Sequence, residues 1–124
     1  MNSLEWADAL KSRTQKFATR IVRVFQSLPH TPDAQALGKQ LLRCGTSVAA
    51  NYRATCRARS KADFISKMGV VVEEADETVF WIELMTETGV LNTERMHDLL
   101  SEANELAIFS ASLFTARKRR RTIQ

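Results

Sequence analysis

The sequence is poor in the residues that interrupt helices. Its 124 residues include only 4 glycines and 2 prolines, so few positions are available for the turns that separate short strands. The two prolines, Pro29 and Pro32, stand almost together and mark a single break. Long helices are therefore predicted, in one domain with one core, because a chain of this length supports no more.

Long apolar runs are also missing. Glu5, Asp8 and Lys11 interrupt the N-terminal region, where a signal peptide would have its apolar segment. No stretch approaches the roughly 20 apolar residues that a membrane-spanning helix needs. We therefore expect a cytoplasmic protein with no membrane partner.

The residue types that carry catalysis are few and stand apart. The two histidines, His30 and His97, belong to no motif, and there is no glycine-rich phosphate loop or His-Glu-x-x-His pattern. Cys44 and Cys56 would lie about 18 Å apart along one helix, at roughly 1.5 Å per residue, which is too far for a disulfide. We expect both cysteines to be small core residues, and we predict that the protein is not an enzyme.

One acidic segment raises the question of a metal site. Its carboxylates are Glu73, Glu74, Asp76, Glu77, Glu83 and Glu87. Four-helix bundles bind pairs of metal ions through glutamates and Glu-x-x-His motifs on facing helices. That motif is missing from this sequence, so we predict no metal site and no cofactor.

Hydrophobic spacing and capping residues predict two helices before residue 60. The first is expected over about 4–28, where Pro29 ends it. Thr31 is then a suitable N-cap, with Pro32 in the first helical position, where its missing amide costs nothing. The second helix is expected to end at about residue 57.

Two further helices are expected in the second half of the chain. Ser60, with Asp63 three residues on, resembles a capping box. A third helix should therefore begin after a tight turn, although the same join could be a kink within a longer helix. Gly89 is well placed to end this helix, and Asn92 or Thr93 can cap the fourth.

Short connections between long helices imply antiparallel neighbours. The predicted fold class is all-α, an antiparallel up-down-up-down four-helix bundle. We assign residues 1–116 to the bundle domain and residues 117–124 to a basic flexible tail. On the third helix, the predicted core positions are Phe64, Met68, Val71, Ala75, Val79 and Ile82.

The net charge of +4 hides a strong segregation of charge. Residues 1–67 carry 12 Lys and Arg against 4 Asp and Glu, whereas residues 68–116 carry 1 against 10. Residues 117–124 add 5 basic residues and no acid. The molecule should therefore have two electrostatic sides.

The second helix combines an apolar face with a basic one. At about 100° per residue, one narrow stripe contains Lys39, Arg43, Arg53 and Arg57. The opposite band contains Leu37, Leu41, Cys44, Gly45, Val48, Tyr52 and Cys56. The band should be buried and the stripe exposed.

Other basic residues extend this stripe. Arg59 and Lys61 continue it around the turn, and a row on the first helix contains Arg13, Lys16, Arg20 and Arg23. Two helices could thus present parallel basic rows to the phosphates of a polyanion, which arginine binds in pairs of hydrogen bonds. Alternatively, the rows could face the acidic side of a neighbouring subunit and serve assembly.

The third helix carries a second apolar patch beyond its core positions. The patch consists of Val70, Phe80, Trp81 and Leu84, mixed with Glu73 and Glu77. Exposed aromatic patches often mark a protein partner or a self-association surface, so we predict an oligomer interface here. The other interpretation is that the bundle simply wraps this helix more fully.

The second and third helices also carry a family resemblance. Residues 40–52, QLLRCGTSVAANY, followed by Arg59-Ser60 and Asp63-Phe64, resemble the small four-helix-bundle proteins known as ribosomal-RNA intervening-sequence or S23-type proteins. The resemblance covers roughly residues 17–113. It implies an antiparallel bundle that assembles as a ring, typically a homopentamer. The same fold is used by the accessory variability determinant of diversity-generating retroelements, a basic barrel that engages a reverse transcriptase and nucleic acid.

The sequence departs from the family pattern at one place. Where the family commonly has Asn-Ile-Ala-Glu-Gly, residues 51–55 read Asn-Tyr-Arg-Ala-Thr, so the acidic residue is gone. Glu77 falls where the family tends to keep a glutamate. We expect a buried carboxylate there, bonded to Asn51, Ser47 or Arg43 in a structural role.

Together these observations predict a non-enzymatic homo-oligomer that binds RNA or DNA. The resemblance implies that the oligomer is a pentameric ring and that it assists an enzyme such as a reverse transcriptase. Arg43, Arg53 and Arg57 are the predicted phosphate-facing residues. The predicted secondary residues are Lys39, Arg20, Arg23, Arg59 and Lys61. The alternative is a protein-interaction module that docks through the apolar patch and has no nucleic-acid role.

Overall fold

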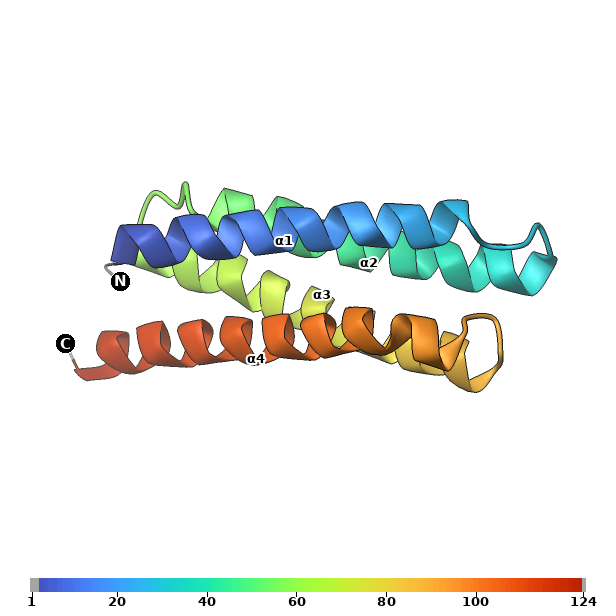
Figure 1. The fold of residues 1–124 in the computed structure, drawn as a ribbon. Coiled ribbons are helices and arrows are strands. Elements are labelled where there is room, and N and C mark those ends of the chain that lie inside the picture. The colour runs from blue at the N-terminus through green and yellow to red at the C-terminus, as the bar shows by residue number, and fades with distance from the viewer. Residues whose placement is uncertain (1–2, 124) are drawn as a thin grey trace.

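The computed structural model describes residues 3–123, which form four long helices joined by short connections (Figure 1). Helix α1 spans Ser3–Gln26, α2 spans Pro32–Thr55, α3 spans Lys61–Glu87 and α4 spans Thr93–Ile123. Successive helices run in opposite directions, so the α2–α3 connection lies at the same end of the bundle as the two chain ends (Figure 1). The predicted all-α, up-down-up-down four-helix bundle is confirmed.

The starts of α2 and α3 lie at the predicted capping residues. The Thr31 hydroxyl accepts a hydrogen bond from the Ala34 amide at 3.4 Å, and the Ser60 hydroxyl accepts one from the Asp63 amide at 3.0 Å. The Asp63 carboxylate in turn accepts from the Arg59 amide at 3.1 Å. These bonds replace the missing intrahelical partners of the first turn. The join between α2 and α3 is therefore a tight turn and not a kink within one helix.

The α3–α4 connection also follows the predicted residues. Gly89 has a φ of 78°, the left-handed conformation that glycine adopts without a steric penalty. Of the two candidate caps for α4, Asn92 is the one used, because its side-chain oxygen accepts from the Arg95 amide at 2.9 Å.

Helix α4 is longer than predicted. The predicted boundary lies at residue 116, before a basic tail over residues 117–124, but the helix continues to Ile123. Arginine and lysine are good helix formers, and their charges interact favourably with the carbonyl end of a helix. Neither glycine nor proline interrupts residues 117–123. The side chains of residues 120–124 lie outside the described part of the structure, so the predicted flexibility of the tail stays a prediction.

Most of the predicted apolar positions form the core, whereas Leu37, Phe64 and Val79 are only partly buried and pack against it. Leu41, Val48 and Tyr52 of α2 are buried, as are Met68, Val71, Ala75 and Ile82 of α3 and Leu99, Ala103 and Leu106 of α4. Cys44 is buried too. The expectation for Cys56 was wrong, because α2 ends at Thr55 and Cys56 is its exposed C-cap residue.

Helices α1 and α2 approach each other closely at Gly45. A Cβ atom at this position would lie 2.8 Å and 2.9 Å from two side-chain carbons of Ile21. Ile21 is fully buried, so it has little freedom to move away. The absence of a side chain at Gly45 is what allows the two backbones to pack at this separation.

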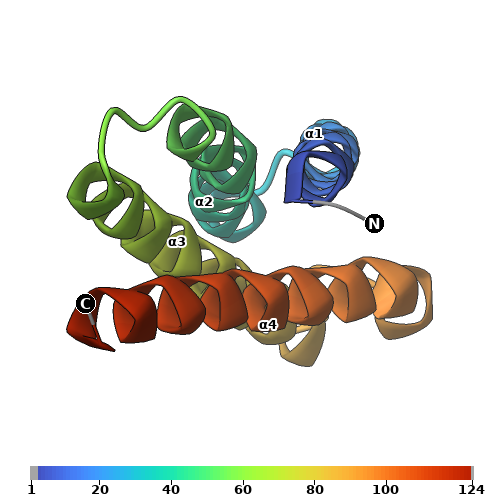
Figure 2. The ribbon, with the colours of Figure 1, turned by 90° about the vertical axis from the view of Figure 1, so that its left-hand side faces the viewer.

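The bundle is open between its first and last helices. Helices that follow each other in sequence pack along their lengths, whereas α4 contacts α1 at few positions and runs obliquely across the bundle (Figure 2). Arg13 joins the two: its guanidinium donates to both Glu102 and Glu105, the latter at 3.2 Å, and lies 5.2 Å from the centre of the Phe109 ring. The hydrogen bond with Glu102 raises the pKa of Arg13.

Candidate nucleic-acid interface

Arg43 is held by carboxylates of α3. It donates to Glu74 at 3.2 Å and also to Glu77, whose Oε1 atom accepts from the indole nitrogen of Trp81 at 3.2 Å. The hydrogen bond from Arg43, followed by that from Trp81, lowers the pKa of Glu77. This network argues against the predicted phosphate-facing role of Arg43, because both terminal nitrogens of its guanidinium already donate to carboxylates of the neighbouring helix.

The network also decides between the three partners predicted for Glu77. Arg43 is the partner, whereas the Asn51 side chain donates to the Ser47 carbonyl at 2.9 Å and to the Ser47 hydroxyl at 2.7 Å. The expectation of a buried carboxylate was wrong, since the Glu77 side chain is 36% exposed. Its position at the edge of α3 is what lets it reach an exposed arginine.

The other predicted basic residues of α1, α2 and the following turn point to solvent. These residues are Arg20, Arg23, Lys39, Arg53, Arg57 and Arg59, and all are exposed. Among the side chains that the structure describes, those of residues 5–119, no ion pair involves any of these six. Their charges are therefore available to an anionic partner.

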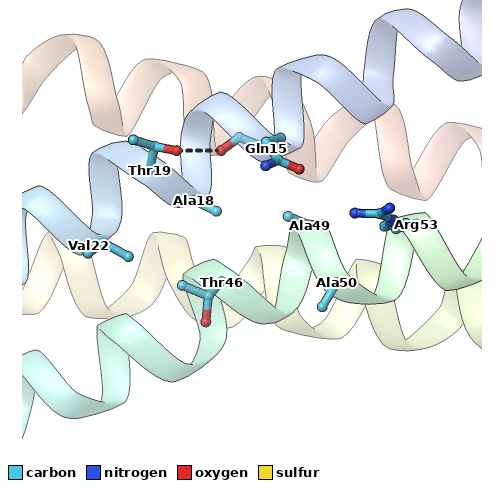
Figure 3. A pocket seen from close by; sticks show the side chains of 8 residues that line it. All are labelled: Gln15, Ala18, Thr19, Val22, Thr46, Ala49, Ala50 and Arg53. Atoms are coloured by element: carbon cyan, nitrogen blue, oxygen red, sulfur yellow. Dashed lines mark hydrogen bonds between the residues drawn. The ribbon is translucent and has the colours of Figure 1, made fainter.

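The two predicted basic rows do not meet across the α1–α2 groove. This groove has a volume of about 340 Å³ and contains only one charged side chain, that of Arg53. Figure 3 shows Arg53 at one end of a surface made of alanine, threonine and valine side chains and Gln15. Arg20 and Arg23 of α1 do not line it, so the rows remain separate surfaces.

A larger pocket gathers the basic residues at the end of the bundle that holds the α2–α3 connection. We call it the end pocket. It has a volume of about 690 Å³ and brings together Lys11, Arg57, Arg59, Lys61 and Arg117, with Asp8 as its single acidic residue. The other lining residues are Ala7, Tyr52, Thr55, Cys56, Ala58, Ser60 and Phe64. All four helices or their connections contribute, and the lining carries four more positive than negative charges.

Contacts around the end pocket fix several of its side chains. The Arg117 guanidinium lies 4.6 Å from the centre of the Phe64 ring, a cation–π contact between α4 and α3. The Tyr52 hydroxyl donates to the Ala7 carbonyl at 3.3 Å and joins α2 to α1. Burial raises the pKa of Tyr52 further above physiological pH, so the phenol keeps the proton that it donates to Ala7. The pocket is thus lined by charged groups on a partly rigid frame.

One nearby carboxylate, that of Asp63, already has a cationic partner. Asp63 accepts from the Lys67 ammonium at 2.9 Å and from the Arg59 amide at 3.1 Å. The hydrogen bond from Lys67, followed by that from Arg59, lowers the pKa of Asp63. Asp63 therefore pairs its charge with a lysine outside the pocket lining and leaves the side-chain charge of Arg59 unpaired.

Comparison with known proteins identifies the family. The family model of the 23S rRNA-intervening sequence protein matches residues 9–110. The chain belongs to the 23S rRNA-intervening sequence protein family. A crystal structure of a protein with unknown function from the S23 ribosomal protein family of Bacteroides thetaiotaomicron is 32% identical, with a TM-score of 0.81. The match covers 88% of this chain and 97% of that one. No curated protein matches the chain.

Two residues that line the end pocket, Lys11 and Arg117, were not predicted from the sequence to belong to the same site as Arg57, Arg59 and Lys61. The sequence pattern gives Lys11 no role, and the predicted domain boundary separates Arg117 from the bundle. The signal was the predicted topology itself, since an up-down-up-down bundle brings the first and last helices to the α2–α3 connection. What pattern reasoning could not supply was the extension of α4 far enough to reach Phe64.

The apolar patch of this family member is partly covered. Val70 and Phe80 are 38% and 54% exposed. Trp81 and Leu84 are only partly exposed, and Trp81 packs against the core. The Phe80 and Trp81 rings meet edge to face, with centroids 5.0 Å apart. The bundle therefore wraps one part of the patch and leaves the other part open.

Among residues 3–123, no helix has an apolar stretch of the length that a bilayer requires.

Proposed function

We propose that this protein is a non-enzymatic, oligomeric accessory protein that binds RNA or DNA through the end pocket and the exposed basic face of α2. The observation that carries the proposal is the gathering of five basic side chains, against one acid, in a single concavity. We propose that the protein assists a nucleic-acid enzyme, such as a reverse transcriptase. The family resemblance supports this partner.

The distribution of ion pairs within the chain supports this proposal. Arg13 pairs with a glutamate of α4, and Arg43 pairs with a glutamate of α3. The described cations that remain include Arg53, Arg57 and Arg59, and they lie along α2 and the turn that follows. Arginine forks match pairs of phosphate oxygens, and each phosphate that is neutralised releases condensed counterions. The predicted binding is therefore strong at low salt and falls steeply as salt rises.

Two matched charge reversals test the proposal. Arg57→Glu changes the end pocket, and Arg95→Glu makes the same charge change in the first turn of α4, at the opposite end of the bundle (Figure 1). Binding of fluorescent RNA and duplex DNA should be measured across a salt series. We expect Arg57→Glu to weaken binding and to reduce the salt slope by about 1 for each phosphate that the variant no longer neutralises. Arg95→Glu should behave like the wild type, and equal effects of the two variants would contradict the proposal.

Self-association through the α3 patch is a second part of the proposal. Phe80 and Val70 form its open part, and a water-exposed aromatic ring beside charged residues is typical of an interface. We propose a homo-oligomer, with the pentamer of the family resemblance as the expected state. The mass from light scattering should fall to that of smaller species in Phe80→Glu. A wild-type protein that assembles through the patch but ignores nucleic acid would favour the protein-interaction module instead.

A further inference from the structure

We propose that the end pocket binds the terminal phosphate of a nucleic-acid strand, so that the protein recognises strand ends. This inference rests on the proposed function and names the part of the nucleic acid that the pocket takes. It starts from a difference in shape between the two basic surfaces. The basic face of α2 is an exposed helix surface, whereas the end pocket is a concavity lined from all four helices or their connections.

Shape limits what can enter the pocket. Phosphates within a duplex follow one another along a continuous backbone, spaced about 3.4 Å apart along the helix axis on each strand. Such a row suits an exposed helix face. A pocket of about 690 Å³ has the size of a small-molecule site, which is typically 300–1,000 Å³, and accommodates the last nucleotide of a strand. The end of a strand is the part of a nucleic acid that can enter without bending the backbone.

Charge favours the same group. A terminal phosphomonoester carries roughly −1.5 to −2 charges at pH 7 and has three free oxygens. A phosphodiester within the strand carries one negative charge and has two free oxygens. The pocket lining has four more positive than negative charges. A group with more charge and more acceptors gains more from this set of donors than an internal phosphate does.

Arg117 prepares the pocket for this ligand. Its guanidinium lies on the Phe64 ring, 4.6 Å from the centroid. A planar guanidinium that stacks on a ring keeps its donors at the edge, where they can bond phosphate oxygens. The ring also restricts the side chain before binding, which reduces the entropy lost on complex formation. Arg57 and Arg59 of the connection approach the same pocket from the side of α2.

The test compares short single strands of one sequence with three kinds of ends: a 5′-phosphate, a 3′-phosphate and hydroxyl groups only. The strands should be titrated with the full-length protein at a salt concentration that weakens non-specific binding. We expect a phosphate at one of the two ends to tighten binding about tenfold over the hydroxyl-ended strand, as one added charged hydrogen-bond group would.

Two double variants with the same change in net charge locate the effect. Arg57→Gln with Arg59→Gln neutralises two residues of the pocket, and Arg20→Gln with Arg23→Gln neutralises two exposed residues of α1 outside it. The pocket variant should lose the preference for phosphorylated ends, and the α1 variant should keep it. All four side chains are exposed, so neither variant removes core packing. Circular dichroism should confirm that both retain the helical fold.

The outcomes separate this inference from the proposed function. If the wild type binds phosphorylated and hydroxyl-ended strands equally, the proposed function stands and the inference is overturned. If the preference survives in the pocket variant, the end pocket is not the site. If no strand binds at all, both fail. Inorganic phosphate and a mononucleotide serve as competitors, and a mononucleotide that binds as tightly as the phosphorylated strand would also overturn the inference, because the strand would then not be the ligand.

Discussion

Replacement of Gly45 by alanine tests the close packing of α1 against α2. The added Cβ atom would meet three side-chain carbons of Ile21, at 2.8, 2.9 and 3.2 Å. Ile21 is β-branched and fully buried, so relief of the overlap requires α1 and α2 to move apart. Gly69 of α3 is the matched control, because an added Cβ there would meet Phe114 at 3.4 Å, an ordinary contact.

The two substitutions are expected to change the free energy of unfolding in opposite directions. Overpacking in a well-filled core costs about 1–3 kcal/mol, and the three close approaches to Ile21 place Gly45→Ala in the upper part of that range. Alanine in place of glycine inside a helix contributes about 1 kcal/mol of stability. Gly45→Ala should therefore lower the free energy of unfolding by about 1–2 kcal/mol, whereas Gly69→Ala should raise it by up to about 1 kcal/mol.

Urea unfolding followed by far-ultraviolet circular dichroism measures both changes. The proteins should be compared at one concentration, because assembly would make the apparent stability depend on it. A Gly45→Ala protein as stable as the Gly69→Ala protein would refute the reasoning, since it would mean that α1 and α2 do not pack at the separation seen here.

Three further predictions concern the ion pairs and the C-terminal helix. Arg13→Ala should lower the free energy of unfolding by about 1 kcal/mol in urea titrations, because it removes a partly exposed bond between α1 and α4. The folded protein lowers the pKa of Glu77 below its usual 4.5, so the carboxylate contributes stability at higher pH that is lost as pH falls through the lowered pKa. The wild type should therefore be more stable than Glu77→Gln by the full amount at pH values above the ordinary pKa of 4.5, and this difference should disappear in acid. Unfolding curves at a series of pH values measure it. Removal of residues 117–124 should weaken nucleic-acid binding more, per charge removed, than removal of residues 120–124, because only the first deletion takes away Arg117 of the end pocket; salt titrations of both truncated proteins measure this.

Local features of the fold were predictable from the sequence, because capping involves residues three or four apart. Thr31 and Ser60 start their helices, and Gly89 follows the end of α3, for reasons that are visible in a few neighbouring residues. The repeating apolar positions predicted the core, and the resemblance in residues 40–52 led to the correct family.

The candidate site was harder to predict because it depends on contacts between distant parts of the chain. The partners of Arg43 are 31 and 34 residues away, and nothing near Arg43 in the sequence shows that it is already paired. The face of α2 predicted the exposed arginines correctly, but the end pocket also requires Lys11 and Arg117, from the first and last helices. The angle at which α4 crosses the bundle decides whether Arg117 arrives there, and helical periodicity carries no information about that angle.

The open side between α1 and α4 has a consequence for how the chain folds. Nearly all of the helix packing joins helices that are adjacent in sequence, and the bonds of Arg13 to α4 are among the few that link the first helix to the last. Folding rates rise as the average sequence separation of contacting residues falls. The chain can therefore build its core by successive docking of neighbouring helices, and we expect rapid folding in which closure of the first helix against the last is a late and minor step.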